Sequence, residues 1–294
     1  MNFLENELSK YYDSACVEKI LAGLNTKHIS SFRVNTLKTT VDSVIEELEK
    51  NNISYKKVGV YDLAFLVEDL GAVQNLDMYK NGLIYVQNVS SMLPPLVLEP
   101  KAKDTILDMC ASPGGKTTEL ATMTENLASI TACEMNNIRI EKLKYNVALQ
   151  GAKSVYVMNA DARNLDSFYS FDKILLDAPC SGSGTLDISN DTYTKFFTPK
   201  LVEKSVKSQL ALLRKAVSIL KKGGTLVYST CSVLKAENEE VLNSVLKDGL
   251  VVVEPISATL ASSLPTLPSM PGTLTVCPDD IYEGFFVAKL KKIK

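Results

Sequence analysis

The chain has 294 residues, of which 46% are hydrophobic and 22% are charged. This composition excludes disorder as the main state, and the length fits one large domain or a large and a small one. With 32 Lys+Arg against 34 Asp+Glu, the net charge of −2 argues against a protein that coats nucleic acid without specificity. The segment MNFLENELSKYYD lacks the order of a signal peptide, and no apolar run approaches the ~20 residues that span a bilayer, so we expect a cytoplasmic protein without membrane contact.

Cysteine and histidine usage excludes several kinds of site. The six cysteines show no CxxC spacing, so neither a disulfide framework nor a zinc ribbon is predicted, and no metal is expected. The only histidine is His28, which removes most hydrolase triads from consideration. Any catalysis is therefore expected to use Cys, Asp, Lys or backbone groups.

The first eighty residues predict a small α+β unit. Residues 31–37 (SFRVNTL) are strand-like, and Val41, Val44 and Leu48 then recur at helical spacing. We therefore expect a small domain over residues 1–80 and a larger one over residues 81–294.

From Asp104 onward the sequence alternates strand, turn and helix. The strand-like segments are DTILDM, ASITACE, SVYVMN, DKILLD, GTLVYST, LVVVE and YEGFFVAKL. Helical spacing lies between them, as at Ile140, Leu143 and Val147 before Gly151. Such alternation predicts an α/β domain with a mostly parallel seven-stranded sheet and helices on both faces. The proline-rich residues 257–278 are predicted to form a loop.

The turns after the parallel strands should line one crevice, because ligands of doubly wound sheets bind at the carboxyl ends of the strands. The first turn reads DMCASPGGKT, and its glycines would let the backbone approach a ligand at a helix N-terminus. A P-loop NTPase is one alternative, but its motif needs glycine at position 110, where the chain has Cys110. A dinucleotide site is also disfavoured, because GxGxxG is absent.

A nucleoside ligand without a pyrophosphate fits these turns better. Glu134 ends the second strand about twenty residues after Gly114, where a carboxylate can bind two ribose hydroxyls. Asp161 follows the third strand, where it can contact the adenine edge. Each acid alone would more often be a helix cap or a solvated turn. Their joint placement at successive strand ends favours S-adenosylmethionine as the cofactor.

Two cysteines follow two further strand ends: Cys180 in DAPCSG after the fourth strand and Cys231 in STCS after the fifth. A lone cysteine is usually a small buried apolar residue, but two at neighbouring strand ends suggest chemistry. A helix expected over residues 236–246 would place amide dipoles near Cys231 and favour its thiolate. A thiolate is a nucleophile suited to electron-poor carbon.

These motifs resemble those of the Nop/Sun family of RNA cytosine-C5 methyltransferases. The resemblance covers nearly the whole chain, through FRVNTLK, YVQNVSSML, DMCASPGGKTTEL, DAPCSGSG, YSTCSVLKAENEEVL and EGFF. It implies a class I Rossmann-type methyltransferase domain preceded by a small RNA-recognition-like domain. It also implies methyl transfer from S-adenosylmethionine to C5 of a cytosine in RNA.

Carried over residue by residue, the resemblance implies that Cys231 is the nucleophile at cytosine C6 and that Cys180 helps to release the product. Asp177 would bind the N3/N4 edge of cytosine, and Lys116 would support the base. Other C5 methyltransferases attack from the proline–cysteine position, so Cys180 stays an alternative nucleophile. The implied cofactor-binding residues are Cys110, Ala111, Pro113, Gly114, Gly115, Lys116, Glu134, Arg139, Asp161 and Asp177.

Two segments are hypotheses for RNA contact. Residues 195–222 are rich in Lys and Arg, have Glu203 as their one acid, and predict a helix with one apolar and one basic face. Its basic face would carry Lys200, Lys204, Lys207, Arg214 and Lys221. A basic helix face is often only solvated surface. The second hypothesis is the N-terminal strand, through Arg33 and Asn35.

The RNA substrate is less closely defined. The family resemblance favours rRNA over tRNA only because many bacterial members act on rRNA, and a monomer is expected. A catalytically silent RNA-binding assembly factor is the alternative from another functional class. The presence of both Cys180 and Cys231 disfavours it.

Overall fold

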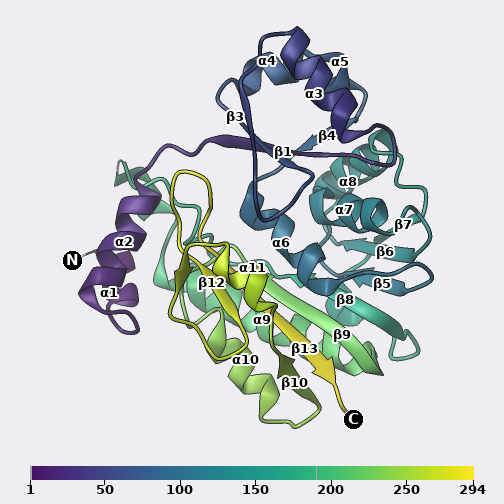
Figure 1. Cartoon of the computed structure of the whole chain (residues 1–294). Coiled ribbons are helices and arrows are strands. Elements are labelled where there is room, and N and C mark those ends of the chain that lie inside the picture. The colour runs from purple at the N-terminus through teal and green to yellow at the C-terminus, as the bar shows by residue number, and fades with distance from the viewer. Residues whose placement is uncertain (1, 190) are drawn as a thin grey trace.

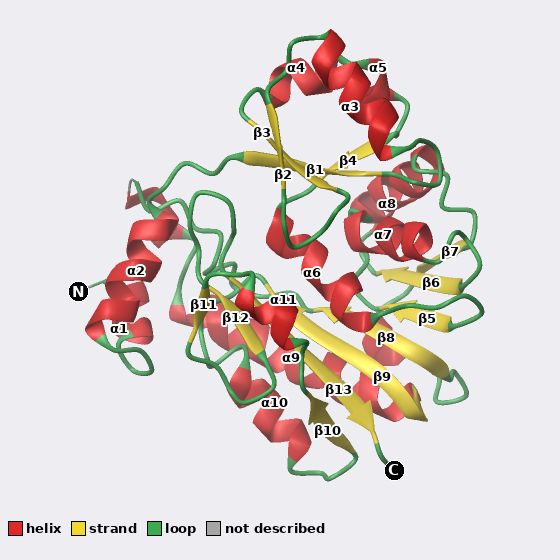
Figure 2. Ribbon diagram, viewed as in Figure 1, coloured by secondary structure: helices red, strands yellow, loops and turns green. Residues whose placement is uncertain are grey.

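Two sheets organise the computed structural model of the chain, which describes residues 2–189 and 191–294. The smaller sheet lies at the top of Figure 1 with short helices above it, and the larger sheet fills the lower part. Helices cover both faces of the larger sheet (Figure 2). The predicted α/β class and the small N-terminal α+β unit are confirmed.

The small sheet is antiparallel throughout and has the strand order β2-β3-β1-β4. Its strands are β1 (Ser30–Val34), β2 (Tyr55–Lys57), β3 (Ala64–Val67) and β4 (Ile84–Val86). Three helices close its core: α3 (Val41–Lys50), α4 (Leu70–Asn75) and α5 (Asp77–Lys80). The Thr40 side chain caps α3, which buries Val44 and Leu48 as its spacing predicted. Strand β4 begins after residue 80 and pairs with β1 of the small sheet. The domain boundary at residue 80 stays a prediction.

The first two helices pack on the large domain and not on the small sheet. They are α1 (Phe3–Leu8) and α2 (Ser14–Leu24), purple in Figure 1, where they lie beside the yellow C-terminal loops. Leu8 and Ile20 share a buried cluster with Phe197 and Val233. The Tyr12 hydroxyl donates a hydrogen bond to the Val233 carbonyl at 3.1 Å. The N-terminal segment therefore braces the loop that follows Cys231.

The large sheet has the order β11-β12-β13-β9-β8-β5-β6-β7, with β10 paired to β13. Five strands are mutually parallel: β5 (Thr105–Asp108), β6 (Ser129–Glu134), β7 (Val155–Asn159), β8 (Phe171–Asp177) and β9 (Leu220–Thr230). The antiparallel strands are β10 (Val251–Glu254), β11 (Thr266–Leu267), β12 (Leu274–Val276) and β13 (Phe285–Lys292).

The sheet has nine strands where the sequence predicted seven. The seven predicted strands are present, and β11 and β12 are additional. They form within the segment predicted as a loop, because Leu274 pairs with Val287 and so extends the sheet beyond β13. The short helix α11 (Ala258–Ser262) lies in the same segment.

Helices on the two faces bury two separate apolar clusters against the sheet. One face is covered by α6 (Val89–Leu98), α7 (Gly115–Met123) and α8 (Asn137–Leu149), and the other by α9 (Pro199–Ile219) and α10 (Glu239–Leu246). Short 3₁₀ turns are η1 (Ala162–Asn164) and η2 (Asp191–Lys195). Ile140 and Leu143 are buried as predicted.

Two helix predictions were wrong at their ends. The basic helix ends at Ile219, so Lys221 lies on strand β9 and belongs to no helix face. The helix after Cys231 begins at Glu239, not at residue 236, because residues 235–238 form turns and Asn238 stands at its N-cap. The N-cap residue Asn238 still bonds Thr230 and Ser232, on either side of Cys231, so the expected effect of the helix N-terminus on Cys231 stays a prediction.

Arg33 and Asn35 are fully buried, which overturns the hypothesis that they contact RNA. The Arg33 guanidinium donates hydrogen bonds to the Thr118 hydroxyl at 2.6 Å and to the Gly115 carbonyl at 3.1 Å, and it lies over the ring of Tyr85. The Asn35 amide donates to the carbonyls of Gly82 and Gln150, both at 2.8 Å. These side chains join the small sheet to the large domain, where RNA cannot reach them.

We expect Arg33→Ala to lower the free energy of unfolding by about 3 kcal/mol or more, because it leaves a cavity and removes the buried donor to Thr118 and Gly115. Urea unfolding at pH 7 measures the change. Lys56→Ala, which alters an exposed lysine on β2, is the control and should change stability by less than about 0.5 kcal/mol. Equal stability of the two variants would contradict the role of Arg33 in joining the small sheet to the large domain.

Candidate active site

Two adjoining cavities lie where the turn between β5 and α7, helix α6 and the ends of the parallel strands meet. The strand-end cavity, about 300 Å³, is bounded by residues that follow β5, β6, β7, β8 and β9. The seam cavity, about 250 Å³, lies between β4, α6 and the first turn of α7. Cys110, Ser112 and Asp177 line both. The strand ends predicted to share one crevice do so.

The turn from β5 to α7 brings most of the predicted loop residues to the cavities. Cys110, Ala111, Pro113, Gly115 and Lys116 line the seam cavity. Gly114 is different: it is the N-cap of α7 with φ of 113°, and a Cβ there would come within 3.1 Å of a Leu143 methyl group. Glycine is needed at this position for the backbone conformation and the close approach to α8.

The buried carboxylate of Asp108 holds the turn between β5 and α7 in place. The Thr117 hydroxyl donates a hydrogen bond to Asp108 Oδ2 at 2.7 Å. Burial raises the pKa of Asp108 to about 6, against the opposing effect of the Thr117 hydrogen bond. As the pH rises above about 6, Asp108 ionises in its buried position, and this lowers the free energy of unfolding.

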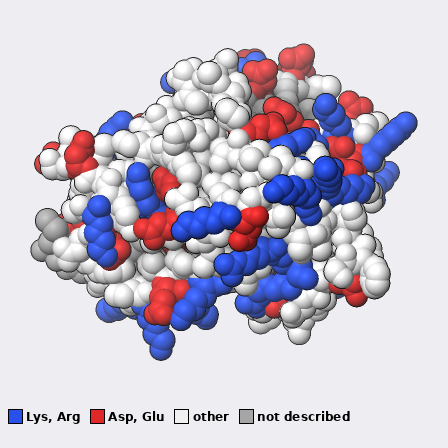
Figure 3. All heavy atoms as spheres, turned by 90° about the horizontal axis from the view of Figure 1, so that it is seen from below, with Lys and Arg blue, Asp and Glu red and all other residues white. Residues whose placement is uncertain are grey.

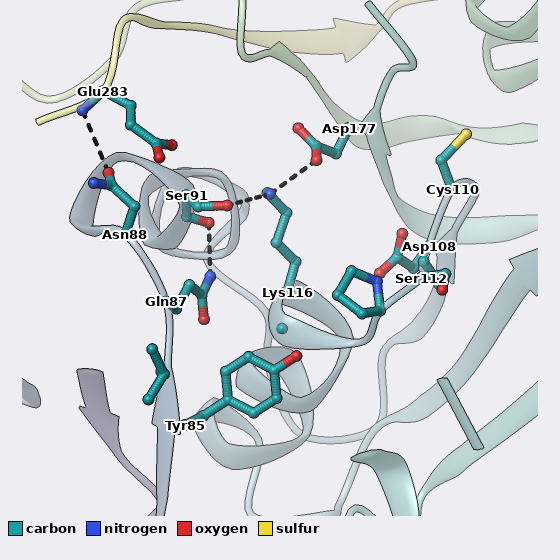
Figure 4. A pocket seen from close by; sticks show the side chains of 14 residues that line it. Tyr85, Gln87, Asn88, Ser91, Asp108, Cys110, Ser112, Lys116, Asp177 and Glu283 are labelled. Carbon is teal, nitrogen blue, oxygen red and sulfur yellow. Dashed lines mark hydrogen bonds and ion pairs between the residues drawn. The ribbon is translucent and has the colours of Figure 1, made fainter. Parts of the chain in front are cut away.

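Lys116 and Asp177 form the central ion pair of the seam cavity. Lys116 Nζ lies 2.8 Å from Asp177 Oδ2 and donates to Ser91 Oγ at 2.6 Å, as Figure 4 shows. The Ser229 hydroxyl donates to Asp177 Oδ1 at 2.7 Å. Burial lowers the pKa of Lys116, but the charge and hydrogen bond of Asp177 outweigh burial and raise the pKa above its ordinary value. Lys116 is thus held as a cation beside Asp177, facing the cavity.

Glu134 and Arg139 lie together at the end of β6 and line the strand-end cavity. Glu134 Oε1 accepts a hydrogen bond from the Asn136 amide at 2.8 Å, and Glu134 Oε2 is 3.5 Å from Arg139 Nη1. Arg139 Nη2 also donates to the Ser112 carbonyl at 2.8 Å. Arg139 therefore ties the start of α8 to the turn after β5.

Asp161 lies in the strand-end cavity with a partner that the sequence analysis missed. Arg163 donates to both carboxylate oxygens of Asp161 at 2.6 to 3.0 Å, and this contact holds the pKa of Asp161 below its ordinary value. The spacing Asp-x-Arg in DAR was the available signal. Each carboxylate oxygen has a second lone pair, so Asp161 can still accept a hydrogen bond from a ligand.

The two cysteines meet at the ends of neighbouring strands. The Sγ atoms of Cys180 and Cys231 are 3.0 Å apart, and both residues are half-buried in the wall of the strand-end cavity. The hydrogen bond with Cys231, together with burial, raises the pKa of Cys180 well above its ordinary value. Cys180 is therefore a neutral thiol near pH 7. Burial likewise raises the pKa of Cys110.

The backbone of the Cys231 loop is fixed by two glycines. The Gly184 amide donates to the Cys231 carbonyl at 3.0 Å, and the Gly284 amide donates to the Gly184 carbonyl at 2.8 Å. A Cβ on Gly184 would lie 2.0 Å from the Gly284 oxygen. The motifs DAPCSGSG and EGFF are therefore in direct backbone contact beside Cys231.

The seam cavity also contains polar residues to which the sequence analysis assigned no role. Gln87, Asn88 and Ser91 come from YVQNVSSML, and Glu283 comes from EGFF (Figure 4). Both motifs were visible in the sequence, but only the fold brings them next to Lys116. Within residues 2–189 and 191–294, no group of three or more His, Cys, Asp or Glu could hold a metal ion. No helix in that part of the chain is long and apolar enough to cross a membrane.

We expect Thr117→Val to destabilise the protein more at pH 8 than at pH 5. The folded-state pKa of Asp108 is already raised to about 6, so its contribution to stability is lost as the pH rises, and removing the hydroxyl raises that pKa further. The extra loss at pH 8 should be about 1–3 kcal/mol by urea unfolding. Thr124→Val removes another buried hydroxyl, which bonds the Leu120 carbonyl, and should show no such pH dependence. A pH-independent effect of Thr117→Val would count against the assignment.

Comparison with known proteins identifies the family. The family model "16S rRNA methyltransferase RsmB/F" matches residues 95–291, and a model of the ferredoxin-like domain of RsmF/B-like methyltransferases matches residues 2–74. Ribosomal RNA small subunit methyltransferase F of Shewanella loihica is 35% identical over an alignment of 303 residues, covering 99% of this chain and 62% of that protein. The tRNA (cytosine(72)-C(5))-methyltransferase of Pyrococcus horikoshii is 34% identical over 226 residues, covering 76% of this chain and 56% of that protein.

A solved structure agrees with these matches over the whole chain. NSun6 from Pyrococcus horikoshii, solved with SFG, superposes with a TM-score of 0.90 at 25% identity and covers 100% of this chain and 98% of that chain. The chain spans between about half and just under two thirds of the length of the first curated relatives it matches. The family model covers most of the large domain and the ferredoxin-like model covers most of the small one, so the chain belongs to the RsmB/F family of Nop/Sun-type methyltransferases.

Proposed function

We propose that this protein transfers a methyl group from S-adenosylmethionine to C5 of a cytosine in RNA through a covalent bond between Cys231 and C6. The observation that carries the proposal is the pair of sulfurs 3.0 Å apart in the wall of the strand-end cavity, with the Lys116–Asp177 ion pair at the same strand ends. The two relatives described above are named for methylation of rRNA and of a tRNA cytosine, which supports the proposal.

The donor groups of the strand-end cavity fit S-adenosylmethionine. Glu134 can accept hydrogen bonds from ribose hydroxyls, and Asp161 can accept one from the adenine amino group. Met109 and Leu212 supply apolar surface for the adenine ring. The similar NSun6 structure was solved with SFG, an analogue of this cofactor. When bound, S-adenosylmethionine supplies an electrophilic methyl group.

Cytosine C5 is too weak a nucleophile to accept a methyl group without activation. The Cys231 thiolate adds to C6, forming a C–S bond, and the displaced electron pair moves through the ring to N3, which takes up a proton from solvent. C5 then has enamine character and can attack an electrophile. Asp177 would accept a hydrogen bond from the N4 amino group and stabilise protonated N3, which favours cytosine over uracil. Lys116 would support the base from the other side.

Release of the product requires a second group near C5. The C5 proton leaves to a base, its electron pair re-forms the C5=C6 bond, and the C–S bond breaks to return the thiolate. We assign this assistance to Cys180, whose neutral thiol can hold and orient a water molecule that accepts the C5 proton and passes it to solvent. N3 returns its proton to solvent in the same step. We assign the nucleophile to Cys231 because the resemblance of the STCS motif to that of the family implies it, and the 3.0 Å distance between the sulfurs fits either assignment. Cys180 as the nucleophile is the alternative.

Ribosomal RNA is the proposed substrate and tRNA the alternative. The exposed Lys200, Lys204 and Arg214 lie on α9, and Ser208 and Leu212 of the same helix line the strand-end cavity. RNA held on the exposed side of α9 would therefore run close to the cysteines. On the face seen in Figure 3, groups of Lys and Arg are interspersed with Asp and Glu. We therefore expect RNA to contact only a limited basic part of the surface. A monomer and a cytoplasmic location stay predictions.

The first test follows both the methyl group and the protein–RNA bond. Wild type, Cys231→Ala and Cys180→Ala are incubated with labelled S-adenosylmethionine and unmodified rRNA or tRNA, then analysed by nucleoside composition and on denaturing gels. We expect 5-methylcytidine with wild type, a retained RNA adduct with Cys180→Ala, and neither with Cys231→Ala.

Three other outcomes would each change the proposal. An adduct in Cys231→Ala only would exchange the roles of the two cysteines. Methylation of tRNA alone would replace rRNA as the substrate. Cofactor binding without transfer to any RNA would favour a catalytically silent RNA-binding factor.

The α9 surface gives a separate prediction for RNA affinity. The double variant Lys200→Glu/Lys204→Glu should weaken RNA binding about tenfold at 0.15 M salt and reduce the slope of affinity against salt concentration, because phosphate contacts are lost. Lys56→Glu/Lys57→Glu, which reverses two exposed lysines on β2, is the charge-matched control. Filter binding over a salt series measures both variants. An unchanged salt slope in the double variant would place the RNA on another surface.

A further inference from the structure

Glu237 is a fully buried carboxylate that links the two cysteine loops. Its Oε1 accepts hydrogen bonds from the Ser181 amide at 2.8 Å and from the Gln209 side chain at 3.3 Å. Its Oε2 accepts from the Ser181 hydroxyl at 2.5 Å and from the Ser232 hydroxyl at 2.6 Å. Ser181 directly follows Cys180 and Ser232 directly follows Cys231. One side chain therefore fixes the residues adjacent to both sulfurs.

The contacts of Glu237 are unevenly divided between the loops. Three of its four hydrogen bonds hold the Cys180 side: two come from Ser181, and the third comes from Gln209, which also donates to the Pro179 carbonyl at 3.1 Å. Gln209 is itself fully buried on α9. The position of the Cys180 loop thus depends on this carboxylate and on the helix behind it.

The Cys231 loop has further supports of its own. The Thr230 hydroxyl donates to the Asn238 side chain at 2.6 Å, and the Asn238 amide donates to the Ser232 carbonyl at 2.9 Å. The hydroxyls of Ser183 and Ser232 are 2.8 Å apart. Because the Ser183 contact also ties the two loops together, removing Glu237 should loosen the Cys180 loop, which loses three of the four contacts, more than the Cys231 loop.

We infer that Glu237 is a positioning residue that holds Cys180 at the distance from Cys231 needed for product release. The inference rests on the proposed function, in which Cys231 forms the adduct and Cys180 assists its resolution. Glu237 itself touches neither the base nor the cofactor in this scheme. Its loss should slow the second half of the reaction and leave the first half largely intact.

The experiment compares adduct formation, single-turnover methyl transfer and multiple turnover in Glu237→Ala. We expect single-turnover transfer within about threefold of wild type, turnover reduced about tenfold or more, and an RNA adduct retained on denaturing gels. Glu237→Gln keeps an acceptor oxygen for Ser181 and should recover part of the turnover. A role limited to folding would lower all three readouts together.

A matched control lies two residues away. Glu239 is also a buried carboxylate, but its side chain bonds Lys235 and Ser269 and neither Ser181 nor Ser232, so Glu239→Ala should not accumulate adduct. If Glu237→Ala does not fold, Ser181→Ala decides, since it removes one hydrogen bond and should retain some adduct.

Three outcomes would overturn the inference, and they are distinguishable. Wild-type turnover in Glu237→Ala, or a parallel fall of adduct and transfer in Ser181→Ala, refutes the positioning role while wild type still makes 5-methylcytidine. Failure of wild type itself to methylate RNA or form an adduct refutes the proposed function and the inference with it.

Discussion

The parallel pairing of β8 with β9 is the constraint on which the candidate site depends. Its register sets Asp177 opposite Ser229, so both strands end at one edge of the sheet and both cysteines follow within a few residues. Side chains alternate between the faces of a sheet, so a slip of one residue would turn Asp177 away from Lys116 and separate the sulfurs. The polar contacts around Glu237 refine a geometry that the sheet has already established.

The contact between the two domains lies directly behind the turn that joins β5 to α7. Arg33 bonds the Gly115 carbonyl at the start of α7, and the next residue, Lys116, reaches the seam cavity. Glu119, one turn further along α7, lies 3.9 Å from Arg33, and burial raises its pKa to about 8. The small domain thus supports the orientation of the helix that presents Lys116 to the seam cavity.

The sequence predicted the strands, their order along the chain and the chemical residues at their ends, because parallel buried strands leave strong apolar runs and special turns. The sequence did not predict which polar residues are buried. Arg33 reads as an exposed strand residue, and only the packing of α7 against β1 shows otherwise. The pattern of α9 continued through Lys221 because the chain passes from helix into β9 without a glycine or proline. Strands as short as β11 leave no periodic signal.

The last strand in chain order, β13, inserts between β9 and β12, and the backbone contact of Gly284 with Gly184 precedes it. During synthesis, β9 must therefore wait with one edge unpaired until residues 285–292 have left the ribosome. An unpaired edge invites association with other chains, and contacts so distant in sequence form slowly. Until β13 pairs with it, β9 would present an open edge next to Cys231, so the strand that forms last in the chain also completes the sheet beside the candidate site.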